Sequence, residues 1–295
     1  MAKQLKPETI EALIQEALAI ESEEAHEAGT VGFMARAMVQ ATMPHKRVRG
    51  NEFSRKNGKF TLNMLAPSKV GLPYGNVPRL LMAWITTEAV QTQNRELLLG
   101  NSLSSFMGEL GFQVTGGRHG SINRMKNQTR RLFATTVNCT YDREEGSAIL
   151  NYMIADKALL WWDAKNPNQR ELWQSSVMLT EPFFREITTN PVPVDMRALK
   201  ALKRSPLALD IYTWLTYRMS YLSHTTRLPW PLLQAQFGSD YADNAQGRRD
   251  FKKSFLVQLM KVQAIYPVNV EPVTDALMLK PNRPHVRRLT KRDTD

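Results

Sequence analysis

The chain has 295 residues, enough for about two domains, and its hydrophobic content of 42 % is ordinary for a packed core. Its net charge of +11 favours anionic partners, nucleic acid above all, and no apolar run approaches the ~20 residues that span a bilayer, so we expect a cytoplasmic protein. A single cysteine, Cys139, excludes an intramolecular disulfide framework and a zinc site built on several cysteines.

The first predicted element is an acidic amphipathic helix within residues 1–28. This segment carries two lysines against seven glutamates, a net charge of −5, which leaves +16 for the rest of the chain. Its apolar residues recur at helical spacing: Ile10, Leu13, Ile14, Ala17 and Leu18. The helix could contact a partner protein or a second subunit, or it could fold back on its own domain.

Residues 29–69 are predicted to form a basic linker or arm. Within them, residues 45–59 combine six cations with two glycines, a composition typical of a flexible segment; they include Arg47, Arg49, Arg55, Lys56, Gly50 and Gly58. Such an arm could lie on phosphates or enter a minor groove, and a solvated linker fits the composition equally well.

A first domain is predicted over residues 70–165. Its elements are a helix opened by Asn76 and Pro78, an extended run at 96–99, a short helix capped by Asn101 or Ser102 and ended by Gly111, a helix capped by Ser121, and a hairpin of 136–141 and 149–154. Cys139 falls on a strand of that hairpin, where a small core residue is expected rather than a nucleophile.

A second domain, predicted over residues 172–282, repeats this order with little shared sequence. Its elements are a helix opened by Ser205 and Pro206, an extended run at 225–228, a helix from Pro231 to Gly238, a basic helix over about 247–265, and a short hairpin of 268–270 and 276–279. Trp84 and Trp214 fall at matching points and are interpreted as core residues. A basic disordered tail, 283–295, is expected to follow.

Helix, strand, helix, turn, helix and a two-stranded wing is the order of a winged-helix module. We therefore predict an α+β fold, predominantly helical, with two tandem winged-helix domains. In helix-turn-helix proteins the recognition helix enters the major groove, which makes the third helix of each copy the predicted DNA reader.

The third helix of the first copy has the densest positive charge. Residues 115–133, "TGGRHGSINRMKNQTRRLF", hold five cations and no carboxylate, whereas a merely solvated helix usually interleaves glutamate. Helical spacing predicts that Ile122, Met125, Thr129, Leu132 and Phe133 face inward. The candidate DNA-binding residues are Arg118, Asn123, Arg124, Lys126, Asn127, Arg130 and Arg131. Arginine pairs with guanine and asparagine with adenine, so Asn123, Arg124 and Asn127 are predicted to choose among bases.

The second copy has a comparable basic cluster at the start of its third helix. Its candidate DNA-binding residues are Arg248, Arg249, Lys252 and Lys253, interrupted by Asp250. A solvated basic face remains the alternative for both helices.

Catalytic motifs are not found. The five histidines are widely separated, so a nicking enzyme with a His-x-His metal site is excluded, and Gly58-Lys59 is followed by Phe60 rather than the serine or threonine of a phosphate loop. Nor does any carboxylate cluster indicate a nuclease. We predict no catalytic residue, no cofactor and no metal.

Several blocks resemble the RepA-type replication initiators of plasmids and, more distantly, TrfA-like initiators. They are "NVPRLLMAWITTEAV" (76–90), "GNSLSSFMGELGF" (100–112), residues 115–133 and "PVPVDMRALKALKRSPLALDIYTWLTYR" (191–218). The resemblance covers about residues 70–284. It implies two winged-helix domains that bind directly repeated iterons in double-stranded origin DNA, help to open an A·T-rich segment, and recruit the host initiator and replicative helicase. It also implies repression of the protein's own promoter and a monomer–dimer equilibrium.

The nearest alternative is a winged-helix transcriptional regulator without an initiation role. Both proteins would read DNA through the same helices. Direct repeats beside an origin would favour initiation, and an isolated inverted repeat over a promoter would favour regulation.

Overall fold

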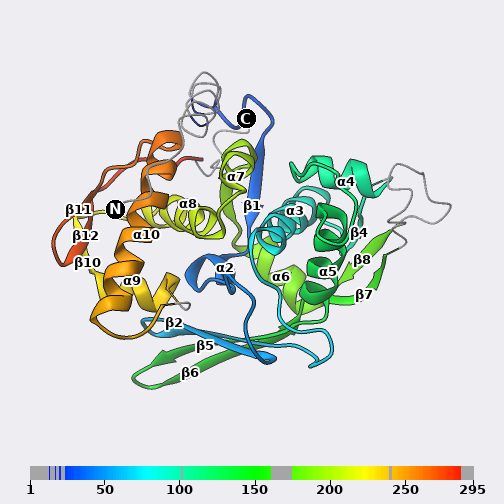
Figure 1. Cartoon of the computed structure of the whole chain (residues 1–295), viewed down its shortest axis with the longest axis horizontal. Helices are drawn as coiled ribbons and strands as arrows, with labels where there is room; N and C mark the ends of the chain where they lie inside the picture. Colours follow the sequence, from blue (N-terminus) through cyan, green and yellow to red (C-terminus); the bar gives the residue numbers. More distant parts are fainter. Residues whose placement is uncertain are drawn as a thin grey trace. The chain divides into compact units, whose positions relative to one another are not determined.

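The computed structural model describes residues 24–100, 102–160, 175–238 and 241–286, together with Leu13, Ala17 and Ile20. The chain divides into two compact units (Figure 1). We call Ala35–Pro191 the α5 unit, after helix α5 (Ser121–Phe133). Met1–Met34 with Val192–Asp295 form the α10 unit, after helix α10 (Ala245–Ile265). The α10 unit is discontinuous in sequence, whereas the two predicted domains were each continuous.

The core of the α5 unit surrounds its longest helix, α3. The described helices of this unit are α2 (Arg36–Gln40), α3 (Asn76–Thr92), α4 (Leu103–Glu109), α5 and α6 (Glu181–Thr189). Helix α3 is buried on nearly all sides and packs against α5 and α6. Trp84 is buried and meets Phe106 edge to face at 5.0 Å, which confirms its interpretation as a core residue.

The prediction of a flexible arm over residues 29–69 is wrong for much of this segment, which forms strands and a helix. Strands β2 (Glu52–Asn57) and β3 (Phe60–Leu65) join β5 (Thr136–Arg143) and β6 (Gly146–Met153) in an antiparallel sheet of order β2-β3-β5-β6. Leu62 and Met64 of β3 are fully buried. The same predicted segment also supplies β1 (Val31–Met34) and α2. Alternating apolar residues in β3 bury one face of the sheet, and this orders a segment whose charge alone indicated an arm.

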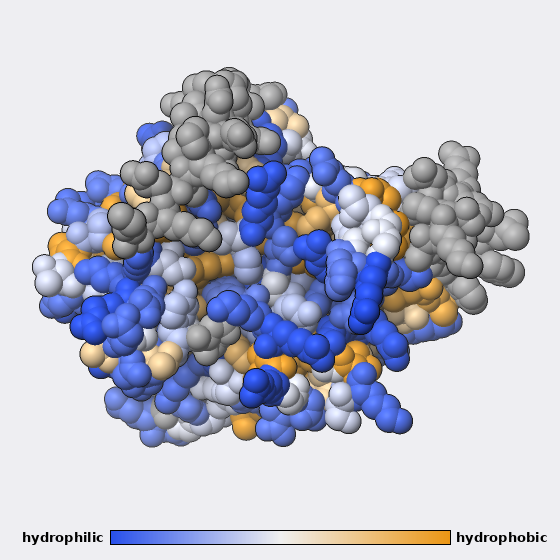
Figure 2. Space-filling model, viewed as in Figure 1, coloured by the Kyte–Doolittle hydropathy of each residue, from blue (hydrophilic) through white to orange (hydrophobic). Residues whose placement is uncertain are grey.

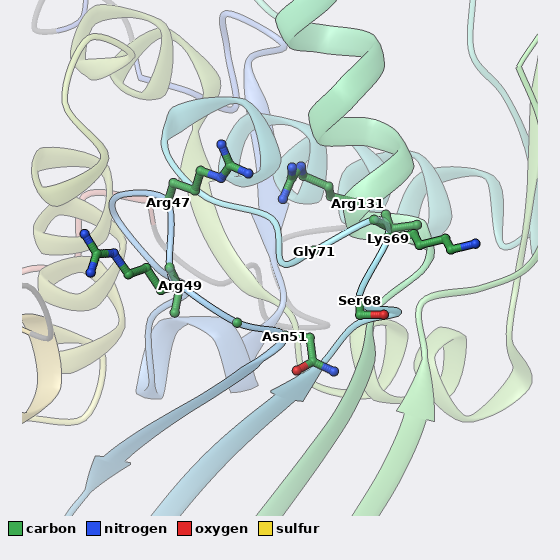
Figure 3. Close-up of a pocket in the computed structure, with 10 residues that line it drawn as sticks. Arg47, Arg49, Asn51, Ser68, Lys69, Gly71 and Arg131 are labelled. Carbon is green, nitrogen blue, oxygen red and sulfur yellow. The ribbon is translucent and has the colours of Figure 1, made fainter.

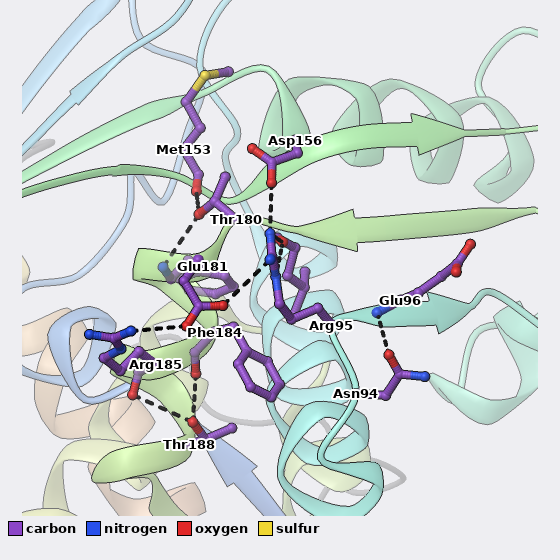
Figure 4. Close-up of polar contacts among 12 residues, drawn as sticks. Asn94, Arg95, Glu96, Met153, Asp156, Thr180, Glu181, Phe184, Arg185 and Thr188 are labelled. Atoms are coloured by element: carbon purple, nitrogen blue, oxygen red, sulfur yellow. Dashed lines mark hydrogen bonds and ion pairs between the residues drawn. The ribbon is translucent and has the colours of Figure 1, made fainter.

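A second sheet of the α5 unit has the order β4-β8-β7. Its strands are β4 (Glu96–Leu98), β7 (Ala155–Leu159) and β8 (Ser176–Leu179). Figure 4 shows Arg95 joining this sheet to α6. Its guanidinium donates to the Leu179 carbonyl at 2.8 and 3.0 Å and pairs with Asp156 at 2.9 Å and Glu181 at 3.4 Å. These contacts fix the position of the sheet relative to α6.

The α10 unit packs its helices on a second three-stranded sheet. Its elements are β1 paired with β9 (Val192–Asp195), then α7 (Met196–Leu202), α8 (Pro206–Met219), β10 (Thr226–Pro229), α9 (Trp230–Phe237), α10, β11 (Val270–Pro272) and β12 (Ala276–Leu279). The sheet has the order β10-β12-β11. Trp214 is buried here, as predicted, with its ring 5.3 Å from that of Phe237.

The predicted repeat of element order is present in both units, with one correction. In the α10 unit, β10 pairs with β12 and β12 with β11; in the α5 unit, β4 pairs with β8 and β8 with β7. The counterpart of the second hairpin is therefore β7–β8. The predicted hairpin β5–β6 does form, but it belongs to the four-stranded sheet, because β5 pairs with β3.

Helix boundaries follow the predicted signals, except that α9 begins at Trp230 rather than Pro231 and two N-caps are shifted. The hydroxyls of Ser102 and Ser205 accept backbone N–H groups three residues on, as N-caps do, and Gly111 has φ +75° after α4. The shifts are at α3 and α5, where Gly75 and Gly120 occupy the N-cap positions predicted for Asn76 and Ser121. Each helix thus starts one residue earlier than its expected cap allows.

The chain ends are described in part. Of the predicted stripe, Leu13 and Ala17 are helical and Leu13 is buried, while Ile10, Ile14 and Leu18 lie outside the described residues; Ile20, which was not in the predicted stripe, is also helical and buried. Residues 287–295 of the predicted tail are also outside them. The start of that tail is ordered, because Val286 is buried and His285 Nδ1 lies 2.7 Å from the Tyr212 hydroxyl.

The His285 contact predicts a pH dependence of stability. The Tyr212 hydroxyl accepts from the Asp195 N–H at 2.9 Å, and its oxygen lies 2.7 Å from His285 Nδ1, within hydrogen-bond distance. Burial lowers the pKa of His285, opposed by Asp195 and supported by Arg197. The unfolded chain then binds more protons, so the free energy of unfolding should fall as pH drops below about 6.5.

This dependence is measured by urea denaturation between pH 7.5 and 5. His285→Gln should reduce the acid-induced loss, whereas His224→Gln, at an exposed histidine, should leave it as in the natural chain. Identical pH profiles for the natural chain and the His285 variant would contradict this account.

The surface is mostly polar. In Figure 2, hydrophilic residues cover most of the visible face and hydrophobic residues appear in small separate areas. Among the helices that the structure describes, none has both the length and the hydropathy needed to cross a bilayer.

Candidate nucleic-acid interface

Helix α5 separates apolar and charged residues onto opposite faces. The five residues predicted to face inward are all buried: Ile122, Met125, Thr129, Leu132 and Phe133. Asn123, Arg124, Asn127 and Arg130 are exposed, and Lys126 and Arg131 are half-buried. Helical periodicity alone predicted this division, because the apolar stripe must pack on α3.

The exposed side chains of α5 differ in their local contacts. Within the described part of the chain, the side chains of Arg118, in the turn before α5, and of Arg124 and Arg130 on α5 make no hydrogen bond or ion pair. Asn123 Nδ2 donates to the Gly117 carbonyl at 2.9 Å, and Asn127 Oδ1 accepts from Arg131 Nε at 2.7 Å. The three arginines therefore keep their donors for a ligand, while the two asparagines would have to exchange a contact.

The turn before α5 is fixed by a compact polar network. Ser121 Oγ donates to the Gln113 carbonyl at 2.6 Å and accepts from the Thr115 N–H at 2.9 Å. A side chain at Gly120 would place its Cβ 2.2 Å from the Gly116 carbonyl oxygen, so only glycine fits there. These contacts define where α5 begins and hence where Arg124 is presented.

The basic side chains of α10 make more hydrogen bonds and ion pairs within the protein than Arg124 and Arg130 of α5 do. Arg248 pairs with Asp243 at 3.0 Å, and Arg249 donates to Gln246 at 2.8 Å. Lys252 was predicted to point outward. Its ammonium instead donates to the Val273 and Thr274 carbonyls at 3.2 and 2.8 Å.

The position of Lys252 has a physical cause. Its ammonium lies 4.9 Å from the ring centroid of Trp230, and the turn between β11 and β12 brings two carbonyls within reach. It therefore holds this hairpin on α10. Lys253 is exposed and, with Arg248 and Arg249, keeps α10 basic on its outer side.

Arg131 lies at the end of α5, beside a cavity that sequence reasoning did not find. The cavity has a volume of about 630 Å³, and Figure 3 shows the Arg47 and Arg131 side chains pointing toward each other in it. Arg131 Nη1 donates to the Leu72 carbonyl at 3.0 Å. Burial lowers the pKa of Arg131, and the charge of Arg47 adds to the lowering. Arg47 and Arg131 are 84 positions apart, so only the fold brings them together.

The side-chain amide of Gln128 is buried, which was not predicted. Gln128 is 3 % exposed, and its Oε1 accepts from the Tyr74 N–H at 2.8 Å. This bond fixes the segment before α3 against α5. Because its partner is 54 residues away, no local pattern marked Gln128 as buried.

Two features that could support catalysis, a reactive thiol and a metal site, are not found in the described residues. Cys139 is buried, and its burial raises the pKa of the thiol to about 11, which keeps it protonated. The described part of the chain holds no group of three His, Cys, Asp or Glu residues placed to bind a metal ion.

Comparison with solved structures gives low-identity matches. Domains 2 and 3 of RctB, as selenomethionine derivatives, align with a TM-score of 0.54 at 10 % identity, covering 84 % of this chain and 99 % of that one. A second RctB structure, residues 155–483, aligns with a TM-score of 0.48 at 13 % identity, covering 76 % and 82 %. The first match supports a shared fold. Comparison with curated proteins gives no match.

The sequence itself gives the family. The profile of plasmid encoded RepA proteins matches residues 72–229, from just before α3 to the end of β10, which is more than half of the chain. This range includes all of α5 with its exposed arginines. The chain therefore belongs to the plasmid-encoded RepA family of replication initiators.

Proposed function

We propose that the chain initiates plasmid replication by binding directly repeated iterons at the origin through α5 and α10. In this proposal it helps to open an A·T-rich segment and recruits the host initiator and replicative helicase. It also represses its own promoter, exists in a monomer–dimer equilibrium, and acts on DNA in the bacterial cytoplasm. Its activity is binding rather than catalysis.

The basic face of α5, together with Arg118 in the turn before it, is the observation that carries this proposal. Arg118, Arg124 and Arg130 are exposed cations without a partner among the described residues, and no carboxylate lies in residues 115–133. Exposed cations that neutralise no carboxylate favour a polyanion. Membership in the plasmid-encoded RepA family makes plasmid DNA the polyanion to test first.

We further propose that each unit acts as a winged-helix module. The element order helix, strand, helix, helix, hairpin recurs, and the sheet orders β4-β8-β7 and β10-β12-β11 correspond. On this interpretation α5 and α10 enter the major groove, and the hairpins β7–β8 and β11–β12 lie along the backbone. The contact of Lys252 with the β11–β12 turn supports a hairpin held close to α10.

A pair of substitutions on α5 tests base reading. Arg124→Ala should relax preference at particular base positions at a cost of about 1–3 kcal/mol, because its guanidinium can donate two bonds to guanine. Lys126→Ala should weaken binding to all sequences alike and reduce the salt dependence. Competition binding with a cognate duplex and its single-base variants measures both. Equal loss of affinity for cognate and random DNA in Arg124→Ala would refute its role as a reader.

The alternative function is transcriptional regulation without initiation. Footprinting on the DNA that flanks the gene distinguishes the two. Protection of direct repeats beside an origin supports initiation, and protection of a single inverted repeat over a promoter supports the regulator.

A further inference from the structure

We propose that the cavity at the end of α5 binds successive phosphates of the DNA backbone, beside the bases that α5 reads. It is formed by the segments that precede β2 and follow β3, together with Arg131 of α5 (Figure 3). None of these segments was predicted to meet α5. The inference rests on the proposed function, and it adds a contact surface outside α5 and α10.

The lining of the cavity calls for an anion. Four of its residues are cations, Arg47, Arg49, Lys69 and Arg131, and none is a carboxylate. Arg47 and Arg131 face each other, which is unfavourable for two positive charges unless an anion lies between them. The Leu72 carbonyl holds Arg131 in this position by accepting from Nη1 at 3.0 Å, and Asn127 accepts from Nε in the free protein.

Glycine makes this close arrangement possible. Gly71 has φ +77°, and a Cβ there would lie 2.6 Å from Arg131 Nη1. Arg131 Nη2 makes no hydrogen bond to any residue that the structure describes, so it remains a donor for a ligand. The site thus combines a fixed guanidinium with a more exposed one from Arg47.

The arrangement fits a chain of phosphates better than a single compact anion. Arg49 and Lys69 point away from the centre in opposite directions, so the charges are spread across the opening. The lining residues include no aromatic side chain on which a nucleotide base could stack. Charges spread in this way match the regular spacing of phosphates along a DNA strand.

The geometry of α5 connects the cavity to the proposed base readers. Arg124, Asn127 and Arg131 are spaced i, i+3 and i+7 and lie on one stripe of the helix. Seven residues of helix span about 10.5 Å, close to the ~12 Å width of the major groove. A reader at Arg124 in the groove would therefore place Arg131 near the phosphates at its edge, where contacts fix the register.

The test uses the full-length chain and a duplex of random sequence, with affinity measured by fluorescence anisotropy at several salt concentrations. Arg47→Gln combined with Lys69→Gln should reduce the slope of log K against log salt by about 2, since each phosphate contact contributes about 0.9. Both side chains are exposed, so folding should be retained. A slope unchanged from the natural chain would overturn the inference.

The matched control removes the same charge from the same hairpin. Lys56→Gln with Lys59→Gln changes two exposed lysines at the opposite end of β2–β3, about 17 Å along a six-residue strand. This control should keep the natural slope. If it flattens the slope equally, the effect reports net charge and the cavity is not a phosphate site.

Failure of this inference is distinguishable from failure of the proposed function. If Arg124→Ala loses sequence preference while the cavity variant keeps its slope, the cavity inference alone is wrong. If the chain prefers no sequence but the cavity variant still flattens the slope, the cavity binds DNA backbone and the initiator proposal is wrong.

Discussion

Phe255→Ala should destabilise the α10 unit by about 3–5 kcal/mol, one of the two largest effects we expect. Phe255 is fully buried, and its ring lies 5.9 Å from Trp230, 5.7 Å from Phe237 and 5.6 Å from Phe251, between ring centroids. Its removal would leave a cavity between α9 and α10. Because the same helix carries the candidate DNA contacts of this unit, its orientation depends on this cluster.

Urea denaturation followed by tryptophan fluorescence measures this effect. Met260→Ala is the control, because Met260 lies on α10 one and a half turns further on, is 56 % exposed, and should change stability by less than about 0.5 kcal/mol. A loss below about 1 kcal/mol for Phe255→Ala would mean that α10 is held by other contacts.

Arg79→Met should destabilise the α5 unit by about 2–6 kcal/mol. Arg79 is 2 % exposed and donates to the carbonyls of Met43 at 2.6 Å, Gly75 at 2.7 Å and Pro44 at 3.1 Å. The Pro44 carbonyl would still accept from the Gly75 N–H, but the Met43 carbonyl would be left buried, and the Gly75 carbonyl half-buried, without this donor. Each such group costs about 1–3 kcal/mol.

Two further variants make this prediction specific. Arg79→Lys should be intermediate, because an ammonium cannot reproduce the planar guanidinium that donates to three carbonyls. Arg185→Met removes a cation that is 75 % exposed and, among the described residues, ion-paired only with Glu181, and it should cost little. The same denaturation assay measures all three. Equal stability of the Arg79 and Arg185 variants would contradict the anchoring role of Arg79.

Local patterns were sufficient to predict most helices and the faces of α5. The inward set of α5 repeats at helical spacing, and Ser102, Ser205 and Gly111 carry boundary signals that depend only on neighbouring residues. The alternation in β5 likewise predicted a strand and a buried Cys139. These features depend on contacts close in sequence, where a single chain contains the needed information.

Long-range pairing was not predictable in the same way. The partner of β4 is β8, about 80 residues away, so the sequence order suggested the nearer β5–β6 as the first wing. The composition of the basic segment before β2 predicts an arm, because the pairing of β3 with the distant β5 cannot be inferred from the sequence. Helical spacing predicts that Lys252 is exposed, but the tertiary fold places the β11–β12 turn beside it. Each error concerns a partner chosen by tertiary structure.

Sequence-specific binding near the gene tests the central claim most directly. Anisotropy of the full-length chain should be measured on duplexes tiled across the DNA flanking its gene, with a shuffled duplex as control, at about 50 and 200 mM salt. With roughly six to ten phosphate contacts, nonspecific affinity should fall by ~10³–10⁵ over this range. The account predicts that a fragment with direct repeats still binds tightly at the higher salt. Loss of all fragments together with the shuffled control would contradict it.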